Sequence, residues 1–363
     1  MGFELKKYTA PDFTKEPFVS APDAVLAPAP KDKTAPENYH ATTIFPEYFK
    51  VNGTWLLAEE SRMDCVAVYE DGKIAVREFR TLKQGELVFV GRTEEAEEGI
   101  FVWTHGFEEP GTQSKEAFAF RQGRSRETAF SKDYDHIYEL LKHEKDHGYV
   151  VWVMGPACAF DSDSREAFSK LVMNGYVDAL LAGNALATHD LEGAYKKTAL
   201  GQDIYTQESF AGGHYNHIDT INRVRYHGSI PEFIEKENID NGIMYSCVKK
   251  GVPFVLTGSI RDDGPLPEVY ADVYEGQSAM RECVKKATTV ICMATTLHSI
   301  ATGNMTPSFR VMPDGTIRQV YFYSVDISEF AVNKLGDRGS LSAKSIVTNV
   351  QDFVVNVSKG LGL

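Results

Sequence analysis

Residues 149–156 read YVVWVMGP, and this stretch indicates how the C-terminal two thirds of the chain fold. Its first six residues are apolar without a break, which predicts a strand buried on both faces, as strands of parallel sheets are. Gly155-Pro156 ends the strand, and we expect a helix to begin at Asp163, with Glu166 as its capping partner, and to end at Asn174-Gly175. A buried strand followed by a helix is the repeating unit of a parallel α/β domain.

The same pattern of strand and then helix recurs toward the C-terminus. Apolar runs at 177–182, 254–257, 289–294, 320–325 and 345–348 each end in small or polar residues. Right-handed crossovers bring the carboxyl ends of parallel strands to one edge of the sheet, where such domains bind nucleotides. The predicted fold class is therefore α/β, with a parallel, Rossmann-like sheet over residues 133–363.

The first part of the chain follows other patterns. Residues 1–37 are rich in proline and charge, a composition that buries little, and we expect an extended N-terminal arm. Residues 38–107 hold short β-branched and aromatic runs separated by turn signals such as Asp71-Gly72 and Gln84-Gly85, which predicts a small β domain. Residues 108–132 are polar and contain glycine, as expected of a linker.

The composition argues against several classes of protein. The 363 residues are 43% hydrophobic and 25% charged, as in ordinary globular proteins, and no stretch approaches the roughly 18 apolar residues of a membrane span. We find no secretory signal, and we expect a cytoplasmic protein whose five scattered cysteines are reduced. The net charge of −13 argues against nucleic-acid binding, which requires concentrated lysine and arginine.

Polar residues at strand ends are the candidates for a dinucleotide site, because the GxGxxG fingerprint is absent from its usual place after the first strand. Asp326 follows the strand at 320–325 and could accept hydrogen bonds from two ribose hydroxyls, although capping the next helix is an equal alternative. A helix opens directly after the strand at 289–294, and its free N–H groups could face phosphate, a pattern that many α/β loops share. The residues that open this helix are Thr295, Thr296, Leu297 and His298.

The densest group of charges lies in the loop SIRDDGPLP, residues 259–267. Arg261 could hold a substrate carboxylate through two hydrogen bonds, and Asp262 or Asp263 could meet an ammonium group or a cofactor hydroxyl. The alternative is an Arg–Asp salt bridge that only stabilises the loop. A magnesium ion on the two aspartates is less favoured, because nothing implies a substrate phosphate.

Histidines are the candidates for proton transfer. His214 and His217 follow Gly212-Gly213 at the start of a predicted helix, and either could be a general acid or base, or simply lie on a surface. Zinc would need a third ligand, and His227 lies at the far end of that helix, so no metal is predicted. His189, next to Asp190, is either an oriented imidazole or an exposed ring.

Several of these motifs together resemble the archaeal-type ornithine cyclodeaminase family, which includes the C-terminal module of cyanobacterial arginine dihydrolase/ornithine cyclodeaminases. The β domain at 39–106 resembles a conserved region named after lysine-oxoglutarate reductase and saccharopine dehydrogenase, and the full resemblance covers about residues 38–358. The motifs that carry it are AGNA at 182–185 with His189-Asp190, GSIRDDGPLP at 258–267, LHSI at 297–300 with GNMTP at 303–307, and DRGS at 337–340.

The resemblance implies a fold similar to the NAD-binding domain of deoxyhypusine synthase, and a bound NAD. Relatives often carry an acid where this chain has Asn349, and this chain has an inserted polar hairpin at 310–319. Arginine hydrolysis is not expected, because the dihydrolase module is absent. The residues implied to meet NAD are Asn184, Ala185, Asp263, Thr295, Thr296, Leu297, His298, Asp326, Asn349 and Val350.

The implied reaction converts L-ornithine to L-proline and ammonia with NAD and without net oxidation. The alternatives are a net amino-acid or opine dehydrogenase, a non-catalytic NAD-binding sensing module and a transferase like deoxyhypusine synthase. Because one methylene changes binding by only about 1–3 kcal/mol, ornithine and lysine are both candidate substrates. We expect a small amino acid as the partner, and a homo-oligomer. The candidate catalytic residues are His214, His217, Arg261 and Asp262.

Overall fold

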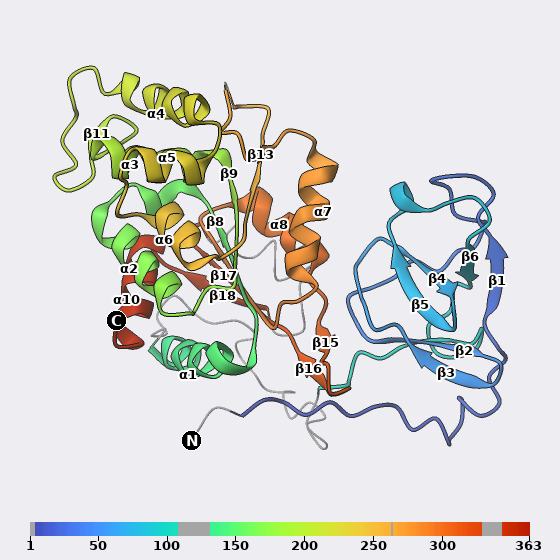
Figure 1. The fold of residues 1–363 in the computed structure, drawn as a ribbon. Helices are drawn as coiled ribbons and strands as arrows, with labels where there is room; N and C mark the ends of the chain where they lie inside the picture. The colour runs from blue at the N-terminus through green and yellow to red at the C-terminus, as the bar shows by residue number, and fades with distance from the viewer. Residues whose placement is uncertain (1–3, 108–130, 263, 329–342) are drawn as a thin grey trace.

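The computed structural model describes residues 4–107, 131–262, 264–328 and 343–363. A small part made of short strands lies beside a larger part in which helices surround a long sheet (Figure 1). Asp263 and the DRGS motif at 337–340 lie outside the described residues. None of the helices in the described ranges is long and apolar enough to span a bilayer.

The larger part is built on seven strands in the order β13-β12-β9-β8-β14-β17-β18. All neighbours pair in parallel, as Val151 does with Ala179 on β9 and Val150 with Thr289 on β14. The predicted parallel α/β sheet is confirmed, and it gains a two-residue edge strand, β13, that the apolar pattern did not predict. The strands are β8 (Val150–Met154), β9 (Ala179–Gly183), β12 (Phe254–Thr257), β13 (Val269–Tyr270), β14 (Thr289–Met293), β17 (Tyr321–Asp326) and β18 (Ala343–Val347).

This strand order creates a topological switch point in the middle of the sheet. From β8 the chain adds β9, β12 and β13 on one side, then returns to place β14 on the other side of β8 and continues with β17 and β18. The connections after β8 and β14 therefore leave in opposite directions. Sheets of this kind bind ligands in the crevice that opens there, beyond the carboxyl ends of the strands.

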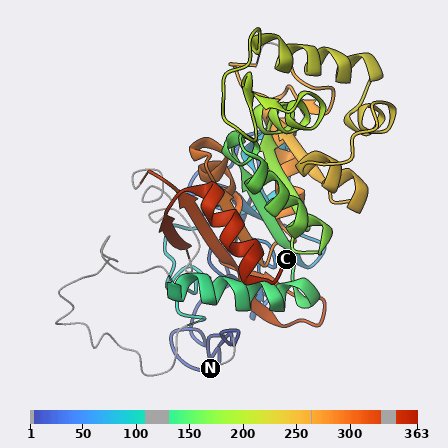
Figure 2. The same cartoon turned by 90° about the vertical axis from the view of Figure 1, so that its left-hand side faces the viewer.

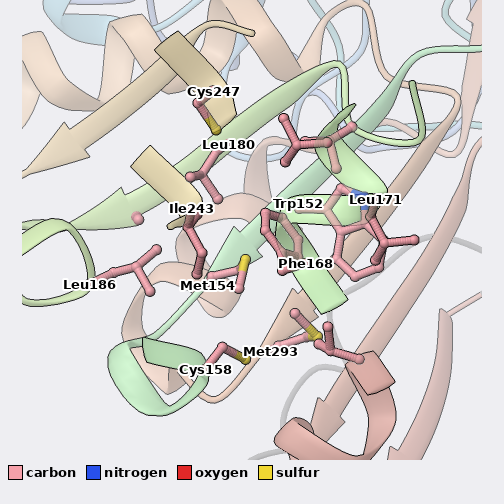
Figure 3. Packing of buried hydrophobic residues seen from close by; sticks show 14 of the residues in the cluster. Trp152, Met154, Cys158, Phe168, Leu171, Leu180, Leu186, Ile243, Cys247 and Met293 are labelled. Carbon is pink, nitrogen blue, oxygen red and sulfur yellow. The ribbon is translucent and has the colours of Figure 1, made fainter. Parts of the chain in front are cut away.

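Helices cover both faces of the sheet, which explains why its strands are apolar without alternation. Trp152 and Met154 pack with Leu180 on one face (Figure 3), and Val151 and Val153 pack on the other. Figure 2 shows α1 running crosswise to α10 on the first of these faces. The first face is covered by α1 (Ser131–His147), α2 (Ser162–Met173), α6 (Ile243–Lys250) and α10 (Val350–Gly360), and the second by α7 (Val273–Val284) and α8 (Thr296–Met305).

Helix α2 shows how the local sequence sets the ends of a helix. Asp161 caps its start, because the Asp161 side chain accepts a hydrogen bond from the backbone N–H of Ser164 at 2.9 Å. Gly175, with a φ of +80°, follows the last turn. The predicted end at Asn174-Gly175 is confirmed, whereas the helix begins one residue before Asp163 and takes its cap from Asp161.

A further helical layer is inserted between β9 and α6. Helix α3 packs against the short helix η2 and against α4, and α4 packs against α5. Figure 1 shows α3, α4 and α5 grouped at one end of the larger part. The inserted elements are α3 (Asn184–Lys196), the hairpin of β10 (Thr198–Ala199) and β11 (Gln202–Asp203), α4 (His214–His227) and α5 (Ile230–Lys236), and they pack beside η2 (Pro156–Ala159), which follows β8.

The smaller part consists of two antiparallel sheets, in the orders β1-β6-β4-β5 and β3-β2-β7. Asp71 and Gly72 join β4 to β5 with φ angles of +50° and +81°, as a tight hairpin turn requires. The predicted small β region is therefore present. Its strands are β1 (Val25–Pro28), β2 (Glu47–Val51), β3 (Thr54–Leu57), β4 (Val66–Glu70), β5 (Lys73–Arg77), β6 (Leu87–Val90) and β7 (Ile100–Val102).

The N-terminal segment differs from the separate arm that its composition suggested. It is extended, but β1 within residues 1–37 pairs with β6, and Phe13 stacks on Trp55 with ring centroids 5.4 Å apart. The reason is that the apolar residues between the prolines still fit an open sheet edge. The boundary that we expected near residue 37, between the arm and the β domain, therefore lies inside the small β part.

The two parts are joined by buried polar contacts. Arg281 of α7 donates hydrogen bonds to the carbonyl oxygens of Ser61 at 3.1 Å and Met305 at 2.6 Å. The backbone N–H of Ser308 donates to the carbonyl oxygen of Ile44 at 2.9 Å. The hairpin of β15 (Phe309–Val311) and β16 (Ile317–Gln319) follows, at the position of the predicted polar insertion.

Candidate functional site

The backbones of β8 and β14 meet closely at the switch point. The N–H of Gly155, directly after β8, donates to the carbonyl oxygen of Met293 at 2.8 Å. A Cβ at position 155 would collide with the carbonyl oxygen of Ala294, so glycine is required there. Ala294 itself has a φ of +52°, a strained conformation that costs about 1 kcal/mol or more in a non-glycine residue. Strain of this kind is often found at functional sites.

Helix α8 begins at this junction with exposed residues. Thr295 is its N-cap, but the Thr295 side chain makes no capping hydrogen bond. Thr296 is exposed, and Leu297 keeps 71% of its surface accessible. The N–H groups of a first helical turn and the positive end of the helix dipole favour anions. The start of α8 at the switch point can therefore receive a phosphate group.

His298 joins the start of α8 to the ends of β9 and β12. Its Nε2 lies 2.9 Å from Oγ1 of Thr257, the last residue of β12. A Cβ on Gly183, the last residue of β9, would lie 3.0 Å from Cε1 of His298, so the ring rests against bare backbone. Burial lowers the pKa of His298, and the nearby Asp262 carboxylate acts in the opposite direction. The imidazole therefore favours its neutral form.

Asn184 connects the start of α3 to the charged loop at 259–267. It is 7% exposed, and its Oδ1 accepts a hydrogen bond from the N–H of Leu266 at 3.0 Å. Ala185, the next residue of α3, is half-buried. The Asp262 carboxylate accepts a hydrogen bond from the N–H of Ser259 at 2.8 Å. Arg261 is exposed, and its backbone N–H donates to Oγ of Ser259 at 3.1 Å.

The ends of β17 and β18 lie at the same edge. Oδ1 of Asp326 accepts a hydrogen bond from the N–H of Ser328 at 2.8 Å, which stabilises the turn after β17. Asn349 caps α10 by accepting from the N–H of Gln351 at 2.8 Å. Val350 is 7% exposed and its side chain packs in the core. A ligand could therefore contact this residue only through its backbone.

Parallel pairing places the carboxyl ends of the strands at one edge of the sheet, and the strand order brings these groups close together there. Asn184 follows β9, next to β8 on one side of the switch point, and Asp326 ends β17, next to β14 on the other. His298 lies on α8, between them. The carboxyl edge of the sheet therefore carries the start of α8, the Asp326 carboxylate and the Asn184 amide at the ends of central strands.

The candidate histidines lie in the inserted helical layer. His214 is exposed at the start of α4. His217 is half-buried and its ring centroid lies 6.1 Å from that of His189. His227 interacts with Glu237 at 2.8 Å at the opposite end of α4, which does not support a zinc site shared with His214 and His217.

The glycines before His214 have a structural reason. A Cβ on Gly201 would lie 2.7 Å from the carbonyl carbon of Gly213, and a Cβ on Gly213 would collide with Gly201 in turn. The hairpin after α3 therefore lies directly against the start of α4. This close approach holds His217 near α3.

His189 and Asp190 have separate roles. Asp190 is fully buried, pairs with Arg165 at 2.9 Å and accepts from the N–H groups of Ile243 and Met244, so it holds α6 in place. His189 is 9% exposed and its Nδ1 lies 3.0 Å from Oε2 of Glu192. The structure thus favours the oriented imidazole over the exposed ring. The sequence reasoning missed Glu192, although its spacing of three residues from His189 on a helix was a usable signal.

The fold defines a Rossmann-type α/β protein with small and polar residues at the carboxyl ends of its central strands. The family described as "Arginine dihydrolase ArgZ-like, C-terminal, Rossmann fold" matches residues 135–357. An ornithine cyclodeaminase from Methanopyrus kandleri is 39% identical over 99% of this chain and 82% of its own length. The chain belongs to the ornithine cyclodeaminase family, as its motifs predicted.

Solved structures agree with this membership. A LOR/SDH protein from Methanococcus maripaludis is 35% identical, with a TM-score of 0.85 over 94% of this chain and 98% of that one. AgrE, a bifunctional arginine dihydrolase/ornithine cyclodeaminase of Nostoc, has a structure in complex with ornithine and NAD+. That structure is 34% identical, with a TM-score of 0.60 over 94% of this chain and 46% of AgrE.

Proposed function

We propose that this protein is an NAD-dependent ornithine cyclodeaminase, which converts L-ornithine to L-proline and ammonium. The observation that carries the proposal is the row of small and polar residues at the carboxyl ends of β9, β8, β14 and β17 in a chain that is 39% identical to a named ornithine cyclodeaminase over nearly its whole length. The reaction is redox-neutral, because the α-nitrogen leaves and the δ-nitrogen closes the ring with no net change in hydride.

The described residues fit a dinucleotide. Gly155 and Gly183 let Ala294 and His298 pack directly against the ends of β8 and β9. The first turn of α8, from Thr295 to His298, would hold the pyrophosphate through its N–H groups. The Asp326 carboxylate would accept hydrogen bonds from a ribose. Asn184 and Ala185 at the start of α3, the backbone of Asn349 and Val350, and Asp263 would complete the contacts.

NAD would supply a hydride acceptor at the α-carbon of ornithine and return the hydride after ring closure. The chain's own residues bind and orient the substrate. Arg261 would hold the substrate carboxylate in a charge-assisted pair, which fixes the position of the α-carbon. Asp262, which lies close enough to His298 to affect its pKa, would meet a substrate amine. A histidine of the α3–α4 layer would move the protons.

The test is incubation of the purified protein with NAD and L-ornithine that carries ¹⁵N at the α-amine. We expect unlabelled proline, ¹⁵N-ammonium in equal amount, and no net NADH. Accumulation of NADH with a keto acid would indicate an amino-acid dehydrogenase instead. NAD binding without any product would favour a sensing module. L-lysine under the same conditions tests the substrate side chain.

We also propose that the protein acts in the cytoplasm as a homo-oligomer. Its five cysteines are buried and unpaired, which suits a reducing compartment. Light scattering after size-exclusion chromatography measures the oligomeric state, and a mass of one chain, 40.4 kDa, would contradict the proposal of an oligomer.

A further inference from the structure

Glu192 is a fully buried carboxylate in the middle of α3. Its oxygens accept hydrogen bonds from Oγ1 of Thr198 at 2.8 Å and from the N–H groups of Leu200 at 3.2 Å and Gly201 at 3.3 Å. Burying a carboxylate is costly unless several donors compensate it. The hairpin after α3 supplies three of them, so Glu192 is held rigidly in place.

The remaining partner of Glu192 is His189, whose Nδ1 lies 3.0 Å from Oε2 of Glu192. An ionised carboxylate only accepts hydrogen bonds, so Nδ1 of His189 must donate. In the neutral ring the other nitrogen, Nε2, then carries the lone pair. A buried carboxylate behind an imidazole holds one tautomer and stabilises the imidazolium after proton uptake, as in catalytic triads.

The position of His189 places this pair beside the switch point. It lies less than two turns from Asn184, at the end of β9. Its ring also packs edge-on against Phe160, with centroids 5.6 Å apart, and Phe160 ends the short helix that follows β8. The side chain keeps 11% of its surface accessible. The pair is therefore anchored near the carboxyl ends of β9 and β8.

His217, on α4, faces the ring of His189. Among the described residues, it is the titratable group from another element that lies against His189. Nδ1 of His217 is buried and has no hydrogen-bond partner within the described residues. Asn216, its neighbour, donates to Oγ1 of Thr198 at 2.9 Å, which links α4 to the donors of Glu192. His217 therefore lies against the ring of His189, whereas His214 is exposed at the start of α4.

We propose that His189, oriented by Glu192, is the residue that moves protons in the reaction, an inference that rests on the proposed function. Nε2 of His189 takes a proton from the α-ammonium of ornithine, so that an N–H bond of the substrate breaks and an Nε2–H bond forms. The imidazolium later returns this proton to the ammonia that leaves, which departs as ammonium. His189 is the catalytic residue of this step, and Glu192 is its positioning residue.

Two variants test the proposal. His189→Gln removes the base, and we expect kcat to fall by about 10²–10⁴-fold, with the Kd for NAD unchanged within about twofold. Glu192→Gln keeps the ring but removes the charge behind it, so kcat should fall less and the acidic limb of the pH–kcat profile should move to lower pH. His147→Gln on α1 and Glu166→Gln on α2, both exposed, are the matched controls.

Three readouts separate this proposal from a purely structural role and from failure of the proposed function. Added imidazole should restore part of the activity of His189→Gln. NMR of ¹⁵N-labelled histidine should show the Nδ1–H tautomer in the native protein and its loss in Glu192→Gln, whether or not the protein makes proline. Circular dichroism shows whether Glu192→Gln folds. If it does not fold, the test rests on the activity of His189→Gln and on its rescue by imidazole. Retention of kcat within about threefold in folded His189→Gln, or an Nε2–H tautomer in the native protein, would overturn the proposal.

Discussion

Replacing Thr257 by valine isolates the hydrogen bond that holds His298 at the crevice. Valine keeps the methyl group that packs at Gly276, where a Cβ would lie 2.8 Å from Cγ2 of Thr257, but it loses the oxygen 2.9 Å from Nε2 of His298. Leaving a buried polar group without its partner costs about 1–3 kcal/mol. Both residues are only partly buried, so we expect the lower half of that range.

The assay for Thr257→Val is thermal unfolding together with NAD titration, and Thr257→Ser is the matched control because it keeps the hydroxyl. For a unit of this size 1 kcal/mol corresponds to roughly 2–4 °C in Tm. We expect Thr257→Val to unfold a few degrees below Thr257→Ser and to bind NAD several-fold more weakly, since a displaced His298 disturbs the first turn of α8. Equal Tm and equal NAD affinity in the two variants would refute the role assigned to this bond.

Three further predictions concern other groups at the crevice. Asp326→Asn should raise the Kd for NAD by about tenfold, or 1.4 kcal/mol, with an unchanged Tm, and unaltered binding would exclude the ribose contact. Arg261→Gln should raise KM for ornithine by 10-fold or more, since hydrogen bonds to a charged group contribute about 1.5–3 kcal/mol, and unaltered kinetics would remove Arg261 from the site. Because burial lowers the folded-state pKa of His298, the unfolded chain binds its proton more readily, and stability should fall as the pH drops below about 6.5. Denaturant titrations of the native protein and His298→Gln should show a smaller loss in the variant, and identical slopes with pH would contradict the shift.

The parallel sheet was predictable because its strands are buried on both faces. Residues 149–154 carry no polar position that a half-exposed strand would need, and the five later runs are mostly apolar, although residues 177–182 include Asp178. Strand order was not predictable from these runs. The pairing of β14 with β8 joins segments that are far apart in the chain, and it leaves no short-range pattern in the sequence.

The candidate site was predictable where residues follow strands, and less so where the chain folds back on itself. Asn184 and Asp326 each follow directly from a strand end. Glu192 in the middle of a helix reads as a surface residue, whereas in the structure it is buried and takes its hydrogen-bond donors from the hairpin that follows α3. Thr257 was predictable as the end of a strand. Its contact with His298 depends on how the start of α8 is placed beside the end of β12, which the sequence alone does not show.

The direct test of the central claim is a crystal structure of the protein with NAD and ornithine bound. We expect the dinucleotide to lie across the carboxyl ends of β9, β8, β14 and β17, with its pyrophosphate at the start of α8 and a ribose hydroxyl within hydrogen-bonding distance of Asp326. Dinucleotide bound away from this edge, for instance between α7 and the small β part, would contradict the account.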